Sequence, residues 1–223
     1  MIICLLVIAA VVILDQVSKA WVMYGLGLDE IGESIPLIEN VFHFTHVRNT
    51  GAAFGIFGAE NERWIFIIAS IIGIGALFIY LCKFRPNSKL ACIAISMIIG
   101  GGIGNMIDRC FRVGIVRGEE RHYVLDFLDF CAFPDLWKWT FNVADAFVCI
   151  GAGLLMVWCI YSFVKDVEAE KRRKLNEIYT DDVDEYSFET TEISENTKKS
   201  EDIENIENTE NIEDNDSTEN TEN

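Results

Sequence analysis

The amino-acid sequence predicts an all-α membrane protein with four transmembrane helices, a small extracytoplasmic β-sheet and a disordered C-terminal tail. The first observation is an unusual composition, since 51% of the 223 residues are hydrophobic while the formal net charge is −17. The second is that residues 165–223 hold 21 of the 35 acidic residues and only 7 of the 18 basic ones. We therefore expect two domains, a four-span domain at 1–164 and an acidic, low-complexity cytoplasmic tail at 165–223.

Three of the expected spans are long runs without a charged side chain. Residues 64–82, 90–107 and 146–164 hold 19, 18 and 19 uncharged residues. A helix of about 20 apolar residues crosses the hydrocarbon core of a bilayer. The sequence therefore predicts spans at approximately 63–82, 90–107 and 141–164.

A fourth span is expected at the N-terminus, approximately at residues 2–24. This apolar segment contains Asp15 and Lys19, which lie four apart on one helical face and can partly neutralise each other. A cleaved signal peptide would begin with basic residues and end at a small-residue cleavage site. Because nothing basic precedes the apolar run, we expect an uncleaved first helix.

The basic residues of the loops predict the orientation. Lys83, Arg85 and Lys89 lie between the second and third spans, and Lys165 follows the last one together with the basic run 171–174. The positive-inside rule places both regions, and hence both termini, in the cytoplasm. The connection that follows the third span, which this orientation places outside, is also rich in arginine, so the difference in basic residues between the two sides is moderate.

In this orientation, polar residues from distant parts of the chain meet at the outer face. At 1.5 Å per residue, Asp15 lies ~20 Å and Asp108 ~28 Å along their helices, and Asp145 lies about one turn inside the last span. Each residue also has a purely structural interpretation: Asp15 and Lys19 as an intrahelical ion pair, Asn142 or Asp145 as a helix N-cap, and Gly100–Gly104 as a close-packing surface. Their convergence at one depth favours a functional site, because a carboxylate inside a membrane is costly.

Five motifs, read in order, resemble those of the bacterial lipoprotein signal peptidases, or signal peptidase II. They are Asp15-Gln-Val-Ser-Lys19, Asn49-Thr-Gly-Ala-Ala-Phe54, Gly101-Gly-Ile-Gly-Asn105-Met-Ile-Asp108-Arg109, Val124-Leu-Asp126-Phe127 and Phe141-Asn142-Val-Ala-Asp145. The resemblance covers roughly residues 1–164. A single motif would be weak evidence, whereas five in order on four spans are specific.

The resemblance implies an aspartic endopeptidase of the bacterial cytoplasmic membrane with its active site at the extracytoplasmic face. It would remove the signal peptide from diacylglyceryl-modified prolipoproteins by cutting before the lipidated cysteine. In the family, the catalytic pair maps onto Asp126 and Asp145, and Asp108 is a supporting residue. Asp129 remains a competitor for Asp126, because the segment reads Leu-Asp-Phe-Leu-Asp-Phe.

A pair of aspartates is chemically suited to hydrolyse an amide without a metal or a nucleophilic side chain. Like charges held close together cannot both ionise easily, so one carboxyl group can act as an acid while the other acts as a base. Which aspartate takes which part is left open, because the pair titrates as a unit. We expect no cofactor and no metal; His43 and His46, three apart, are first interpreted as polar positions of a strand.

The other matched residues are expected to support the site or the substrate. Asn49, Asn105 and Asn142 can orient carboxylates or the substrate backbone, and Arg109 can hold a carboxylate bidentately. Asp15 and Lys19 are expected to brace the first helix against the site. The alternation at Val41–Val47 and the Thr50-Gly51 turn predict a small sheet, and the resemblance implies a similar β-cradle there.

One segment departs from the family pattern. Sixteen residues, 110–125, separate Arg109 from Asp126, where relatives have a shorter connection. The segment 117–123 is expected to be a polar, exposed insertion that bulges outward without displacing Asp126.

The expected partners are diacylglyceryl-modified prolipoproteins and membrane lipids, and no nucleic acid. The tail from about Leu175 onward has almost no apolar periodicity, and we expect it to be disordered without a catalytic role. A four-span transporter is the main alternative, although no internal repeat is visible. A membrane scaffold with buried ion pairs is the other alternative.

Overall fold

The computed structural model describes residues 1–51, 59–84, 86, 88–132 and 139–176. Within these ranges, four helices are long and apolar enough to cross a membrane, and each overlaps one of the expected spans: Ile2–Gly25, Arg63–Lys83, Lys89–Phe111 and Val143–Asn176. The first contains α1 (Ile2–Ala20), the second belongs to α2 (Ala59–Lys83) and the third is α3 (Lys89–Phe111). The chain divides into two compact units, Met1–Tyr161 and Ser162–Asn223.

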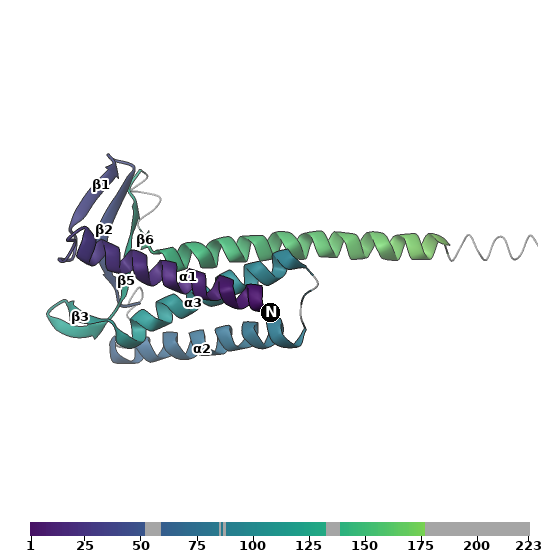
Figure 1. Cartoon of the computed structure of the whole chain (residues 1–223), viewed down its shortest axis with the longest axis horizontal. Coiled ribbons are helices and arrows are strands. Elements are labelled where there is room, and N and C mark those ends of the chain that lie inside the picture. Colours follow the sequence, from purple (N-terminus) through teal and green to yellow (C-terminus); the bar gives the residue numbers. More distant parts are fainter. Residues whose placement is uncertain (52–58, 85, 87, 133–138, 177–223) are drawn as a thin grey trace, which may run out of the picture. The chain divides into compact units, whose positions relative to one another are not determined.

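In the first unit, α3 is the central helix and packs against both α1 and α2 (Figure 1). Of its most apolar window 44% is buried, against 28% for the first span and 11% for the second. Its glycines permit this packing, as the sequence predicted. A Cβ atom on Gly100 would lie 2.7 Å from Cβ of Val11, and one on Gly101 would lie 2.4 Å from the carbonyl oxygen of Ala144. Glycine therefore allows backbones to approach here more closely than any other residue could.

The first helix changes its hydrogen-bonding pattern where it leaves the apolar region. α1 continues into one turn of π-helix, η1 (Trp21–Gly25), and Gly27 then turns the chain with a φ of 66°. Val22 of this turn packs with Leu28 and with Phe127 of a distant strand. This small apolar cluster fixes the end of the helix against the sheet.

The main sheet has four antiparallel strands in the order β1-β2-β5-β6. The strands are β1 (Ser34–Ile38), β2 (Phe42–Asn49), β5 (Val124–Phe130) and β6 (Thr140–Phe141). The sheet lies beyond the C-terminal ends of α1 and α3 (Figure 1). The predicted strand at Val41–Val47 corresponds to β2. Because β2 pairs with β5, opposing Val47 and Asp126, the chain brings the Asn49 motif beside the Asp126 motif.

The long connection after Arg109 forms an ordered hairpin. β3 (Val113–Val116) pairs with β4 (Glu119–His122), and Arg117 and Gly118 between them both have positive φ, 56° and 84°. Two residues of positive φ suit the right-handed twist of a hairpin. The backbone N–H of Tyr123 donates to the carbonyl oxygen of Arg112 at 3.2 Å, which closes the base. The chain therefore leaves the end of α3 and returns to β5 at nearly the same place.

The last helix begins at Val143, two residues later than predicted, because Phe141 belongs to β6. It also continues past the expected end at 164 and reaches Asn176. The residues after Val164 are mostly good helix formers, and Glu170 pairs with Lys174 four residues on at 2.8 Å. The first twelve residues assigned to the tail are therefore helical. The rest of the predicted disordered tail, 177–223, lies outside the described residues.

Candidate active site

Asp126 is held on β5 by two side-chain amides. Its side chain is 2% exposed. Nδ2 of Asn49 donates to Oδ2 of Asp126 at 2.8 Å, and Nδ2 of Asn142 donates to Oδ1 at 2.7 Å. The backbone N–H of Gly51 donates to Oδ1 of Asn49 at 2.8 Å, so the Asn49 amide has one orientation. The turn after β2, where Gly51 has a φ of 82°, thus directs the Nδ2–H group of Asn49 at the buried carboxylate of Asp126.

Asp145 lies in the first turn of the last helix and is half-buried. Its backbone N–H donates to Oδ1 of Asn142 at 3.0 Å, and the backbone N–H of Asn142 donates to Oδ2 of Asp145 at 3.1 Å. This reciprocal pair is a capping box, with Asn142 as N-cap and Asp145 three residues later. The structural interpretation of these two residues is therefore correct. It does not exclude a catalytic one, because the same contacts orient the carboxylate.

Two asparagines connect the two carboxylates. Asn105 on α3 donates from Nδ2 to Oδ1 of Asp145 at 2.7 Å, and its Oδ1 accepts from Nδ2 of Asn142 at 3.0 Å. The fully buried Asn142 therefore contacts Asp126, Asp145 and Asn105 at once. Every carboxylate oxygen of the two aspartates has a donor, and three separate chain segments supply these donors.

The electrostatic surroundings of Asp126 favour its protonated form. Burial, and then the negative charge of Asp145, raise the pKa of Asp126 to about 7, although the amides of Asn49 and Asn142 act in the opposite direction. A proton that ordinary aspartic acid loses near pH 4 is thus retained. One protonated and one ionised carboxyl group, close together, can act as an acid and a base.

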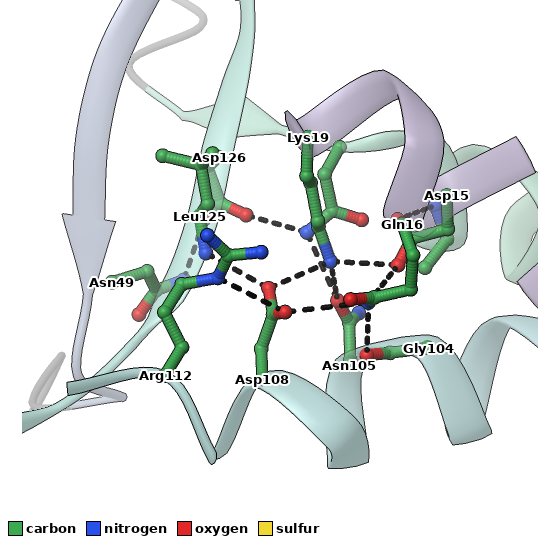
Figure 2. A network of polar contacts seen from close by, with 12 residues as sticks. Asp15, Gln16, Lys19, Asn49, Gly104, Asn105, Asp108, Arg112, Leu125 and Asp126 are labelled. Atoms are coloured by element: carbon green, nitrogen blue, oxygen red, sulfur yellow. Dashed lines mark hydrogen bonds and ion pairs between the residues drawn. The ribbon is translucent and has the colours of Figure 1, made fainter. Parts of the chain in front are cut away.

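A second polar group, centred on the buried side chains of Asp15, Lys19 and Asp108, lies beside Asp126 (Figure 2). The ion pair that the spacing of Asp15 and Lys19 predicts is present, at 2.8 Å. Nζ of Lys19 also lies 2.9 Å from Oδ2 of Asp108 and 3.1 Å from Oδ1 of Asn105. The pair is therefore part of a network between α1 and α3 rather than an isolated contact within one helix.

Arg109 differs from the expectation, whereas the placement of Asp129 agrees with the choice of Asp126 over it. The guanidinium of Arg109 lies over the ring of Phe66, 4.4 Å from its centroid, and no bidentate pair with a carboxylate is present among the residues that the structure describes. Asp129 accepts a hydrogen bond from Thr45 at 2.9 Å. It lies three positions from Asp126 on the same strand, where side chains alternate between faces, so the two point to opposite sides of the sheet.

Two members of the buried network, Gln16 and Arg112, were not predicted as site residues from the sequence. Gln16 donates from Nε2 toward Oδ2 of Asp15, the carbonyl oxygen of Gly104 and Oδ1 of Asp108, at 3.0, 3.1 and 3.3 Å. Nε of Arg112 lies 3.1 Å from Oδ1 of Asp108. Gln16 could have been found from the sequence, because it is a polar side chain inside the first predicted span, three residues before Lys19. Arg112 follows the third span, in a connection that contains several other arginines, and gave no signal.

Comparison with known proteins agrees with this arrangement. The family model described as signal peptidase (SPase) II matches residues 7–161. The lipoprotein signal peptidase of Halothermothrix orenii is 41% identical over 153 residues, which cover 69% of this chain and 92% of that protein. The lipoprotein signal peptidase of Geobacillus kaustophilus is 38% identical over 149 residues, covering 67% and 87%.

Two solved structures, both described as a bacterial membrane enzyme, have the same fold. One is 31% identical with a TM-score of 0.59 and covers 73% of this chain and 90% of that one. The other is 32% identical with the same TM-score and covers 71% and 93%. Each match covers most of the relative's length, and the family model ends at residue 161, before the tail. On its sequence and its fold alike, the chain belongs to the signal peptidase II family.

Proposed function

We propose that this protein is an aspartic endopeptidase that removes the signal peptide from diacylglyceryl-modified prolipoproteins, cutting before the lipidated cysteine. The observation that carries the proposal is the pairing of Asp126 and Asp145 through the buried side chain of Asn142. The names of its relatives, lipoprotein signal peptidases, support the class of substrate.

The proposal includes an orientation in the bacterial cytoplasmic membrane. Both termini face the cytoplasm, and the sheet and the two aspartates lie at the extracytoplasmic face. The basic residues 83–89 and 165–174 support this orientation through the positive-inside rule. The sheet lies at the C-terminal ends of α1 and α3, whereas the basic residue Lys89 begins α3 at its other end, which agrees with this orientation.

The geometry suggests how the two carboxyl groups divide the work. Asp126, almost fully buried and with its pKa raised to about 7, holds the proton and donates a hydrogen bond to the scissile carbonyl oxygen. Asp145, half-buried and accessible to water, accepts a proton from the attacking water. The water oxygen bonds to the carbonyl carbon, and the C–N bond then breaks. One proton ends on the amino group of the cysteine, and the water oxygen stays in the new carboxyl group of the signal peptide.

Cleavage of a diacylglyceryl-modified prolipoprotein in detergent tests the proposal. We expect folded Asp126→Asn and Asp145→Asn variants to lose at least about 100-fold in kcat, the lower range of acid–base contributions. Asp129→Asn is the matched control, because it changes the same strand on its other face, and it should cut at the wild-type rate. An active Asp126→Asn together with an inactive Asp129→Asn would contradict the assignment. Failure of the wild type to cut any such substrate would overturn the function.

A further inference from the structure

Asp126 and Asp145 belong to different elements, so catalysis needs something that fixes their separation. Asp126 lies in the middle of β5, and Asp145 lies in the first turn of the last helix. The amides of Asn105 and Asn142 orient the carboxylates, but these side chains also depend on where the strand and the helix lie. The main chain around each aspartate must therefore be held from outside the pair.

A buried carboxylate holds the main chain immediately before each of the two aspartates. The backbone N–H of Leu125, the residue before Asp126, donates to Oδ2 of Asp108 at 3.2 Å. The backbone N–H of Ala144, the residue before Asp145, donates to Oδ1 of Asp15 at 3.0 Å. Leu125 and Ala144 are both completely buried, so water does not compete for these N–H groups. Hydrogen bonds to charged acceptors are also stronger than neutral ones.

The two supporting carboxylates are joined to each other by Lys19 and Gln16. Nζ of Lys19 lies within 2.9 Å of an oxygen of both Asp15 and Asp108, and its third donor position is directed at Asn105. Gln16 bridges the same two carboxylates from the preceding turn of α1. We call Asp15, Gln16, Lys19 and Asp108 the α1–α3 polar cluster (Figure 2).

Together with Arg112, which pairs with Asp108, the charges of this cluster are balanced without the catalytic pair. Lys19 and Arg112 lie opposite Asp15 and Asp108, two positive charges for two negative ones. Lys19, Asp15 and Asp108 are at most 1% exposed, so an uncompensated charge there would be costly. The cluster therefore does not need the charge of Asp126 or Asp145 for its own stability, and the catalytic pair is free to exchange its proton.

From this arrangement we propose that Lys19 and Gln16 are positioning residues for peptide hydrolysis. They join Asp15 to Asp108, and through these carboxylates they hold the main chain before Asp126 and before Asp145 at a fixed separation. The inference rests on the proposed function, since it takes Asp126 and Asp145 as the catalytic pair. It assigns their alignment to a buried network that holds the main chain before each aspartate and Asn105, and that touches neither the substrate nor the reacting water.

The test compares Gln16→Leu and Lys19→Met with wild type, using the full chain and the prolipoprotein assay. We expect kcat to fall about 10- to 100-fold in both variants, the size of effect that a misplacement of about 1 Å produces. KM should stay within about twofold, because neither residue contacts the substrate in this arrangement. Ser18→Ala is the matched control on the same helix. Its hydroxyl donates only to the carbonyl oxygen of Asp15, and kcat should not change.

A pH profile, read together with kcat per folded protein, separates the electrostatic effect of Lys19 from positioning and from a general loss of structure. The charges that act on Asp126 are those of Asp145 and Arg109 and, from α1, that of Lys19, which lowers the pKa of Asp126. In Lys19→Met the alkaline limb of kcat should therefore move to higher pH. In Gln16→Leu it should stay in place, because no charge is removed. A role confined to folding would lower the yield of both variants and leave kcat per folded protein at the wild-type value.

The outcomes separate the inference from the function on which it rests. If Asp126→Asn is inactive while folded Gln16→Leu and Lys19→Met keep the wild-type kcat, the inference is wrong and the function stands. If Asp126→Asn stays active, the function itself fails. Should Lys19→Met yield no folded protein, Gln16→Leu decides: a wild-type kcat overturns the inference, and a lower kcat with unchanged KM supports it.

Discussion

Asparagine residues control the chemistry of this site at the scale of single residues. Asn49, Asn105 and Asn142 each direct an N–H group at a carboxylate oxygen of Asp126 or Asp145. Amides suit this task because they donate without adding a charge, so they orient a carboxylate and leave room for one proton on the pair. A lysine or arginine in direct contact would favour ionisation of both aspartates and remove the acid.

The raised pKa of Asp126, about 7, leads to a prediction for the pH dependence of cleavage. Because the proposed mechanism needs a proton on Asp126, activity is present below this pKa and is lost as the pH rises through it. We expect kcat/KM to fall about tenfold per pH unit well above pH 7. Measuring kcat/KM between pH 5 and about pH 9 in detergent tests this.

Asn49→Ala provides the comparison for this profile. The Asn49 amide stabilises the ionised form of Asp126, so its removal should raise the pKa of Asp126 further and move the alkaline limb to higher pH. A profile that is flat from pH 6 to about pH 9 in wild type would contradict the assignment of the proton to Asp126.

At the scale of elements, α3 aligns the site because its glycine face lets the other helices approach. A Cβ atom on Gly104 would lie 2.6 Å from Oδ2 of Asp15, and one on Gly101 would lie 2.4 Å from the carbonyl oxygen of Ala144. These two positions are the places where α3 meets the first helix and the beginning of the last one. Close packing and the polar network are therefore parts of one arrangement.

We predict that Gly101→Ala destabilises the protein and lowers its activity. The new methyl group would meet backbone rather than a flexible side chain, so the start of the last helix, with Asp145, must shift. Overpacking of this kind costs about 1–3 kcal/mol in the free energy of unfolding. Thermal unfolding and kcat in detergent measure the two effects. Gly73→Ala on α2 is the control, since a Cβ there would meet nothing within 4 Å. Equal melting temperatures for the two variants would refute the prediction.

The β3–β4 hairpin is predicted to be dispensable for peptide hydrolysis. Its base is closed by the hydrogen bond between Tyr123 and Arg112, so a two-residue Asn-Gly turn in place of residues 113–122 should leave β5 where it is. We expect kcat/KM with a prolipoprotein to stay within about threefold of wild type, as is usual for changes at an exposed loop tip. A folded but inactive variant would show that the hairpin takes part in substrate binding or alignment.

At the scale of the whole molecule, the residues that form the site lie within 15–145, and the family match ends at residue 161. The acidic composition of the chain comes mainly from residues beyond these limits. We predict that a protein ending at Asn176, where the last described helix ends, cuts a prolipoprotein with unchanged kcat and KM. Side-by-side kinetics of this truncation and the full chain test it. A loss of kcat without a loss of folded protein would assign the tail a role in catalysis.

The order and spacing of polar residues predicted much of the fold. Charge-free runs located the membrane helices to within a few residues, because the hydrocarbon core sets both their length and their polarity. The end of the last helix was less predictable. Residues 165–176 are charged enough to resemble the tail but are also good helix formers, so they continue the helix.

The sequence by itself determined the family, the membrane spans and the two aspartates that the site brings together, because each depends on residue types at fixed separations along the chain. Only the tertiary structure decided which donors reach which oxygens: that Lys19 is shared between Asp15 and Asp108, that Gln16 joins them, and that Arg109 lies over an aromatic ring. These contacts join α1 to α3, two helices far apart in sequence. They depend on how closely the helices pack and how each is rotated, and a one-dimensional pattern does not contain that information.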